Sequence, residues 1–143
     1  METLLKMNLS SFGSIDSSIK GRDLVEVICK SLGLLQEKSK RDVVVDVFYI
    51  LNKFKKENLA ISSVDLREEV ISLRKSLGLD LKGTAPSNIR RILKELMDFG
   101  FIERKSSKYM FKGFEDPSVI FKEIIDLKLK KIISRNVSYL SKL

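Results

Sequence analysis

Apolar side chains recur every three or four residues over five parts of the chain, a spacing that is typical of amphipathic helices. With their caps and terminal glycines, the five predicted helices cover residues 22–32, 41–57, 62–78, 84–100 and 116–140. The second of them begins with the β-branched run DVVVDVFYI at 42–50, which would also suit a strand. We predict a helix there because the helical spacing persists from Val44 to Phe54.

Short polar motifs mark the starts of two of these helices. Ser62 followed by Asp65 resembles a capping box in which Asp replaces the usual Glu or Gln. Ile61, just before the cap, could add a short strand. Thr84 is the predicted N-cap of the fourth helix, and Pro86 fits its first turn, where backbone N–H groups lack helical partners.

A β-hairpin is predicted after the fourth helix, which we expect Gly100 to end. The runs FIERK at 101–105 and KYMFK at 108–112 have the composition of two strands. They would be joined by a turn at Ser106 and Ser107, although the Asn-Gly pair that marks the commonest hairpin turns is absent.

The last predicted helix begins with Asp116 as N-cap and Pro117 as its first residue. Its apolar face drifts, so that one flat contact would not cover both the first half, around 120–127, and the second half. The apolar residues of the second half are Leu129, Ile132, Ile133, Val137 and Leu140. We predict that they form a homodimer interface; the alternative is that the N-terminal helix at 22–35 covers them within one chain.

The composition and net charge of the chain indicate an anionic partner. The 143 residues suffice for one domain with a core, and 43% of them are hydrophobic. Lys and Arg number 27 against 19 Asp and Glu, which gives a net charge of +8. A small protein this basic often binds nucleic acid or another anionic surface, although surface charge for solubility is the plainer interpretation.

Several classes of function lose support from the sequence. The chain has no histidine, which removes the common metal sites and catalytic triads that need one. Neither GxGxxG nor GxxxxGK[ST] occurs, so we expect no enzyme, no cofactor and no metal. The one cysteine, Cys29, lies in an apolar stretch and is predicted to be buried. With no apolar run long enough to span a bilayer and a poor signal-peptide pattern, we expect a cytoplasmic protein with no membrane partner.

The run SNIRRILKELMDFGFIERKSSKYMF, at 87–111, resembles the recognition helix and wing of winged-helix transcription regulators. The resemblance covers about 41–112, half of the chain, and resolves no particular family. It implies a mainly α (α+β) fold with a winged helix-turn-helix domain at 41–113. An N-terminal segment and helix at 1–40 and a C-terminal dimerisation helix at 114–143 would flank that domain.

Candidate DNA-binding residues follow from this arrangement. Residues 84–113 carry seven Lys and Arg against three Asp and Glu, a net +4 that is half of the formal charge. The candidates on the helix and the wing are Ser87, Asn88, Arg90, Arg91, Lys94, Arg104, Lys105, Ser106, Ser107 and Lys108. Asn88 could equally be a residue of the helix start. We favour Arg91 over Arg90 for the groove, because Arg90 lies beside Leu93 and Met97 on the apolar flank.

The expected function is therefore a homodimeric transcriptional regulator that binds double-stranded DNA through a recognition helix and a basic wing. The alternative is a winged-helix protein-interaction module of a transcription or replication assembly. RNA binding is a third possibility, but exposed aromatic residues among basic ones are few. The sequence indicates neither a target site nor a small-molecule effector.

Overall fold

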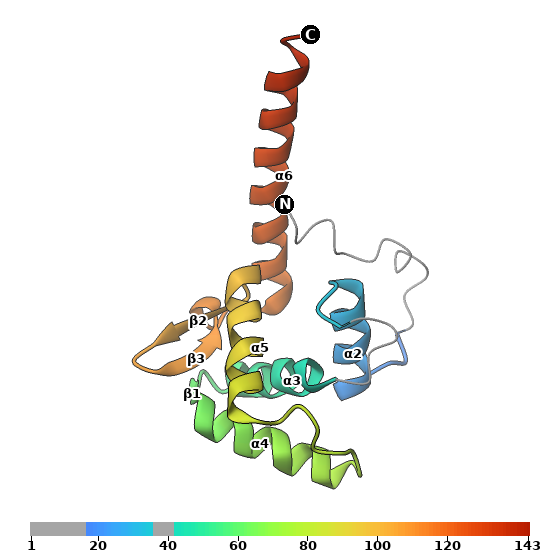
Figure 1. Ribbon diagram of the computed structural model, residues 1–143, viewed down its shortest axis with the longest axis vertical. Helices are drawn as coiled ribbons and strands as arrows, with labels where there is room; N and C mark the ends of the chain where they lie inside the picture. The colour runs from blue at the N-terminus through green and yellow to red at the C-terminus, as the bar shows by residue number, and fades with distance from the viewer. Residues whose placement is uncertain (1–16, 36–41) are drawn as a thin grey trace.

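The computed structural model describes residues 17–35 and 42–143 (Figure 1). In these ranges the helices are α2 (Gly21–Ser31), α3 (Val43–Lys56), α4 (Ser63–Ser76), α5 (Pro86–Phe99) and α6 (Pro117–Leu140). The strands are β1 (Ile61–Ser62), β2 (Ile102–Lys105) and β3 (Lys108–Phe111), and a 3-10 turn, η2 (Lys112–Phe114), follows them. The predicted mainly helical α+β class is confirmed. The first 16 residues and the predicted helix start at residue 41 lie outside the described residues.

The three strands form one small antiparallel sheet in the order β1-β3-β2. Ile61 pairs with Tyr109, so the short strand expected before α4 is confirmed. Lys105 pairs with Lys108 at the end of the predicted hairpin. Ser106 and Ser107, which connect them, have φ angles of 51° and 66°. Positive φ at both positions is typical of the type I′ turn, which matches the twist of a two-residue hairpin.

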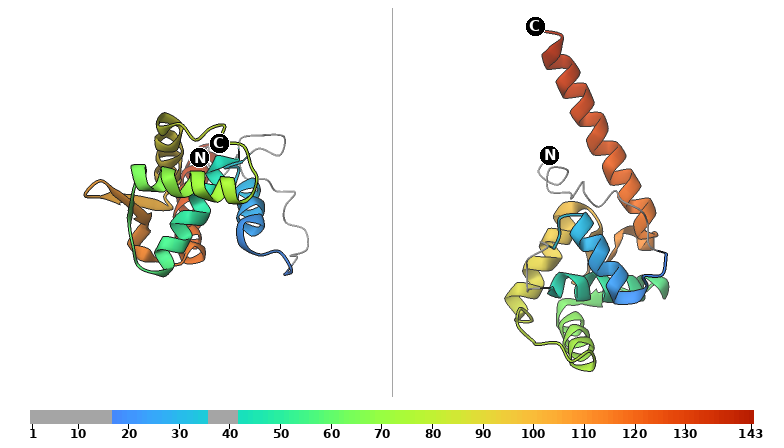
Figure 2. Two further views of the ribbon diagram at one scale, coloured as in Figure 1. Left: turned by 90° about the horizontal axis from the view of Figure 1, so that it is seen from below. Right: turned by 90° about the vertical axis from the view of Figure 1, so that its right-hand side faces the viewer.

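Helix α3 lies at the centre of the fold, where it contacts α2, α4, α5 and β3 (Figure 2). All residues from Val43 to Phe48 are buried, which explains the β-branched run. Tertiary packing on every side overrides its preference for a strand. The ring of Phe48 meets those of Phe101 and Phe111 edge to face, with ring centroids 5.4 and 5.1 Å apart. These rings attach the hairpin to the helical core.

Two predicted caps have opposite outcomes. The capping interaction before α4 is confirmed, because Asp65 N donates to Ser62 Oγ at 3.1 Å. The predicted N-cap at Thr84 is wrong: the cap position of α5 is Ala85, whose side chain makes no capping hydrogen bond. The hydroxyl of Thr84 instead donates to the carbonyl oxygen of Leu81 at 2.7 Å. It therefore closes the preceding turn.

Gly100 ends α5 in the left-handed conformation, as predicted, with φ at 106°. The site also lacks room for a side chain, because a Cβ there would lie 3.1 Å from Cδ1 of Ile124 in α6. The first half of α6 packs on the body through buried Ile120 and through Phe121, whose ring stacks on Phe101 at 6.4 Å. The second half extends beyond the body (Figures 1 and 2).

No helix in the described parts of the chain is both long and apolar enough to pass through a bilayer.

Candidate nucleic-acid interface

Helix α5 presents a polar surface because its apolar side chains are fixed in the core. Ile89, Ile92, Leu93 and Leu96 are all buried. The side chains on the remaining face include Ser87, Arg90, Arg91 and Lys94, and all four are exposed. The helix therefore carries four of the five candidate residues predicted on it in positions that a large ligand can reach.

Asn88, the fifth candidate, is half-buried and has a structural role. Its Nδ2 donates to the carbonyl oxygen of Gly83 at 2.5 Å, which ties the start of α5 to the preceding loop. Its Oδ1 accepts from Arg91 Nε at 3.0 Å and from Arg91 Nη2 at 2.7 Å. The interpretation of Asn88 as a residue of the helix start thus has direct support from geometry.

The two arginines of α5 differ in their surroundings. The guanidinium of Arg91 is held by Asn88 on one side and forms an ion pair with Glu95 on the other. Within the described part of the chain, no polar partner is found for Arg90 or Lys94. An anion would therefore meet Arg90 and Lys94 directly, whereas Arg91 would have to exchange its contact with Glu95.

The hairpin carries the second group of candidates. Lys105 Nζ lies 3.3 Å from Glu103 Oε1, and Arg104 lies over the ring of Tyr109, 5.8 Å from its centroid. Lys108 stands opposite Lys105 and is exposed, as are the two serines of the turn. Like charges repel across a strand pair, and the contact between Lys105 and Glu103 offsets part of the repulsion between Lys105 and Lys108.

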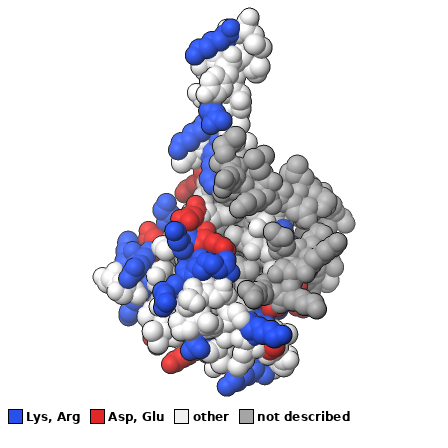
Figure 3. Space-filling model, viewed as in Figure 1, with Lys and Arg blue, Asp and Glu red and all other residues white. Residues whose placement is uncertain are grey.

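Lys and Arg side chains over α5 and over the hairpin appear together on the face shown in Figure 3. Acidic side chains are mixed with them, and Glu95, Asp98 and Glu103 belong to the same segment. Basic side chains of α5 and of the hairpin thus share one face, with acidic side chains among them (Figure 3).

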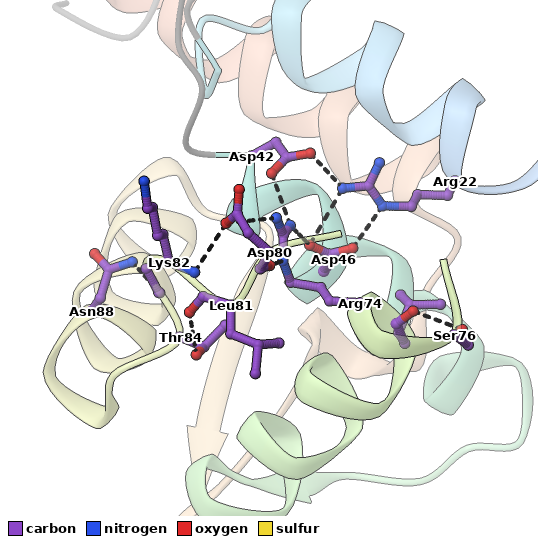
Figure 4. Close-up of polar contacts among 12 residues, drawn as sticks. Arg22, Asp42, Asp46, Arg74, Ser76, Asp80, Leu81, Lys82, Thr84 and Asn88 are labelled. Carbon is purple, nitrogen blue, oxygen red and sulfur yellow. Dashed lines mark hydrogen bonds and ion pairs between the residues drawn. The ribbon is translucent and has the colours of Figure 1, made fainter. Parts of the chain in front are cut away.

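A buried ionic cluster of Arg22, Asp42, Asp46 and Arg74 lies away from these candidates (Figure 4). Asp46 is fully buried, and its carboxylate accepts hydrogen bonds from Arg22 Nε at 2.6 Å and from Arg74 Nη1 at 2.7 Å. The carboxylate of Asp42 accepts hydrogen bonds from Arg22 Nη2 at 2.7 Å and from Arg74 Nη1 at 2.8 Å. The cluster joins α2, α3 and α4, since each helix or its flank supplies at least one charge.

Burial by itself would raise the pKa of Asp42, but hydrogen bonds from Arg22 and Arg74 outweigh it and hold this pKa below its ordinary value. Asp42 therefore stabilises the fold above its unfolded pKa of about 3.9, and this contribution is lost as the pH falls through the folded pKa. Burial also acts to lower the pKa of Arg74, and its two carboxylate partners raise it overall. Asp42 and Arg74 are therefore both charged at neutral pH.

The cluster also reaches the loop that precedes α5. Arg74 Nε donates to the carbonyl oxygen of Asp80 at 2.6 Å, and the carboxylate of Asp80 accepts from the backbone N of Lys82 at 3.0 Å (Figure 4). Nearby, Arg67 Nε donates to the carbonyl oxygen of Thr84 at 2.6 Å. These bonds fix the path of the chain into α5, and so the position of its exposed face.

Sequence reasoning missed this cluster. Its one local signal is Asp46, an acid in the middle of the apolar run of α3. Its partners Arg22 and Arg74 lie 24 and 28 residues away, beyond the reach of any periodic pattern.

Cys29 is fully buried, as predicted, and burial raises the pKa of its thiol to about 12. It is therefore a protonated core residue at neutral pH, and its chemistry does not point to a reactive site.

The residues predicted for dimerisation remain accessible on the second half of α6. Leu129, Ile133, Val137 and Leu140 are exposed, the last at 64%, and Ile132 is half-buried. The alternative prediction, that the N-terminal helix covers this stripe, is not supported by α2. Helix α2 packs on α3 instead.

Comparisons of the chain with protein-family models, with curated proteins and with solved structures found no match. Function is therefore inferred from the geometry and charge of the residues described above.

Proposed function

We propose that the chain is a winged-helix protein that binds double-stranded DNA as a homodimeric transcriptional regulator. The order α3, β1, α4, α5, β2 and β3 supports a winged helix-turn-helix domain, in which α5 is the recognition helix and the β2–β3 hairpin is the wing. The fold alone would not decide the function, since the same fold also serves protein contacts.

The observation that carries the proposal is the shared face of α5 and the hairpin. Arg90 and Lys94 are exposed on the helix, and Lys105 and Lys108 are exposed at the tip of the hairpin. A major groove is wide enough for a helix, and a basic hairpin beside it can contact the phosphate backbone. In this arrangement Arg90 and Lys94 hold phosphates or base edges, and the wing fixes the register.

Arg91 is the residue proposed to read bases, and this stays a prediction. Its guanidinium is oriented by Asn88 and Glu95 in the unbound chain. These two partners hold the guanidinium along the surface of α5, and a guanine edge would replace the carboxylate of Glu95 as its acceptor.

The dimer is proposed to form through the second half of α6. Its exposed apolar residues lie on one side of a helix that extends from the body (Figure 1). A second copy would bury them and would hold two recognition helices at a fixed spacing, suited to a two-fold symmetric site.

Binding to a labelled duplex of random sequence, measured by fluorescence anisotropy over a range of salt concentrations, tests the proposal. We expect binding that weakens steeply with salt, with a log–log slope of about −0.9 for each phosphate contacted. Weak binding at low salt with a flat slope would overturn the proposal.

That outcome would favour the second candidate function, a winged-helix module that grips another protein. The specific observation behind it is the ion pair between Arg91 and Glu95, together with the nearby Asp98 on the same helix. These acids lower the positive potential where a recognition helix would need it most. A mixed-charge face of this kind is typical of the rim of a protein interface.

A further inference from the structure

A row of basic residues on α6 has no part in the proposed contacts of α5 and the wing. Lys128, Lys131 and Arg135 are separated by three and four residues, so they share one side of α6. Lys142 follows in the turn just after the helix ends at Leu140. We call these four residues the α6 basic stripe. Lys131, Arg135 and Lys142 are exposed, and Lys128 is half-buried.

The direction of the α6 basic stripe is fixed by its first member. Lys128 Nζ lies 5.4 Å from the ring centroid of Phe99, the last residue of α5. The stripe therefore starts beside the C-terminal end of α5 and runs outward along α6. Figure 3 shows Lys and Arg side chains along the edge of α6 that lies on the side of the hairpin, on the same face as those over α5.

The positive charge of residues 127–143 is not offset by acidic residues in the same segment. Residues 127–143 contain five Lys and Arg and neither Asp nor Glu. Within the described ranges no ion pair is found for the stripe; the guanidinium of Arg135 lies instead over the ring of Tyr139, 6.0 Å from its centroid. Such a run of like charges on a rigid helix favours an anionic partner.

The stripe is also distinct from the proposed dimer surface. Leu129, Ile133 and Leu140 occupy another side of the helix, because residues that are one or two positions apart point in different directions. Ile132, four residues after Lys128, lies at the border between the two surfaces. A second copy that packs on the apolar side therefore leaves the basic side free. It would also leave the cations of two helices near one another unless an anion neutralises them.

We propose that the α6 basic stripe binds the phosphate backbone of the same duplex, beyond the C-terminal end of α5. This inference rests on the proposed function and adds a second electrostatic contact surface to it. From Lys128 to Arg135 the helix rises about 10.5 Å, a length over which a duplex carries about six phosphates, and Lys142 follows just after the end of the helix. Acidic side chains lie between the two groups of cations in Figure 3, so the stripe acts as a separate patch.

The test uses the full chain with Lys131, Arg135 and Lys142 changed to Gln. Gln keeps the helix propensity, and all three side chains are exposed, so the fold should persist, which circular dichroism checks. A matched control removes three exposed lysines elsewhere: Lys20→Gln, Lys56→Gln and Lys75→Gln, which lower the net charge by the same amount. Affinity for a random duplex is measured against salt for wild type and both variants.

We expect the stripe variant to flatten the log–log salt slope by about 0.9 for each phosphate it no longer binds, up to about 2.7 in all, while the control changes little. Equal slopes for the two variants would overturn the inference, even with a wild type that binds DNA. A wild type without salt-dependent binding would instead overturn the proposed function. Loss of binding to vesicles of anionic phospholipid by the stripe variant, with an unchanged DNA slope, would assign the stripe to a lipid surface and also overturn the inference.

Discussion

At the scale of single residues, the cluster around Asp46 is where charged side chains of the fold are buried against one another. Asp46 and Arg74 are almost fully buried, and each has hydrogen bonds to more than one partner. A well-packed apolar replacement of a whole buried ion pair is often harmless, but removal of one member leaves a charge uncompensated. The cluster is thus better understood as a device that fixes how α2, α3 and α4 meet than as a large net source of stability.

Changing Asp46 to Asn should lower the free energy of unfolding by about 3–5 kcal/mol, because Arg22 and Arg74 lose a buried counter-charge. Urea denaturation of the two proteins measures the difference. Asp80→Asn is the matched control: Asp80 is 63% exposed and lies 3.7 Å from the same Arg74, so its removal should cost less than about 1 kcal/mol. Similar losses of stability for both variants would show that burial does not set the energetics of the cluster.

The sequence could not have predicted this cluster in full, and the reason is separation along the chain. A hydrophobic period reports on neighbours within a few residues, while Arg22 and Arg74 meet only after α2 and α4 have packed on α3. Thr84 shows a second limit. Its type and position suit an N-cap, yet its hydroxyl donates back to Leu81, because hydroxyls can also close local turns.

At the scale of elements, the β2–β3 hairpin shows how local preference and fold can disagree. The composition of its two runs predicts the strands, and Tyr109 and Phe111 are buried as expected, although Met110 between them is buried too. The turn is harder to recognise from sequence, since serine rarely adopts positive φ. Strand pairing and ring packing therefore impose the type I′ turn on residues that do not favour it.

Changing Ser107 to Gly should raise the free energy of unfolding by about 1 kcal/mol, because glycine adopts a φ of 66° without steric cost. Thermal and urea unfolding measure the change. The same substitution at Ser72, an exposed position inside α4, should act in the opposite direction by roughly 0.5 kcal/mol. A lower free energy of unfolding for Ser107→Gly would mean that contacts of the serine side chain stabilise the fold by more than its positive φ destabilises it.

The β2–β3 hairpin, the proposed wing, offers a second prediction at this scale. Changing Lys105 and Lys108 to Ala should weaken binding to all duplexes about equally and flatten the log–log salt slope by about 0.9 for each phosphate that is released. Anisotropy titrations at several salt concentrations measure the slope. Lys56→Ala with Lys75→Ala removes the same charge at the ends of α3 and α4 and serves as the control. An unchanged slope in the wing variant would place the wing away from the backbone.

At the scale of the whole molecule, α6 determines whether two copies of the chain can form the proposed dimer. Its two halves differ: the first packs on the body through Ile120 and Phe121, while the second leaves Leu129, Ile133 and Leu140 exposed. The drift of the apolar face makes this division predictable from the sequence, because a single contact surface could not satisfy both halves. The sequence leaves open whether the N-terminal helix covers the second half, and α2 packs on α3 instead.

Changing Ile133 and Leu140 to Asp should convert a dimer to a monomer and weaken DNA binding, since burial of one such side chain stabilises by roughly 1.5–3 kcal/mol. Sedimentation at micromolar concentration measures the assembly, and circular dichroism verifies that the body stays folded, as expected for changes at two exposed positions. Ser134→Asp with Ser138→Asp adds the same charges to the same exposed half of α6, away from the apolar side, and should leave the dimer intact. A wild-type chain that sediments as a monomer at these concentrations would refute the dimer, and two-fold symmetric recognition would then lose its structural basis.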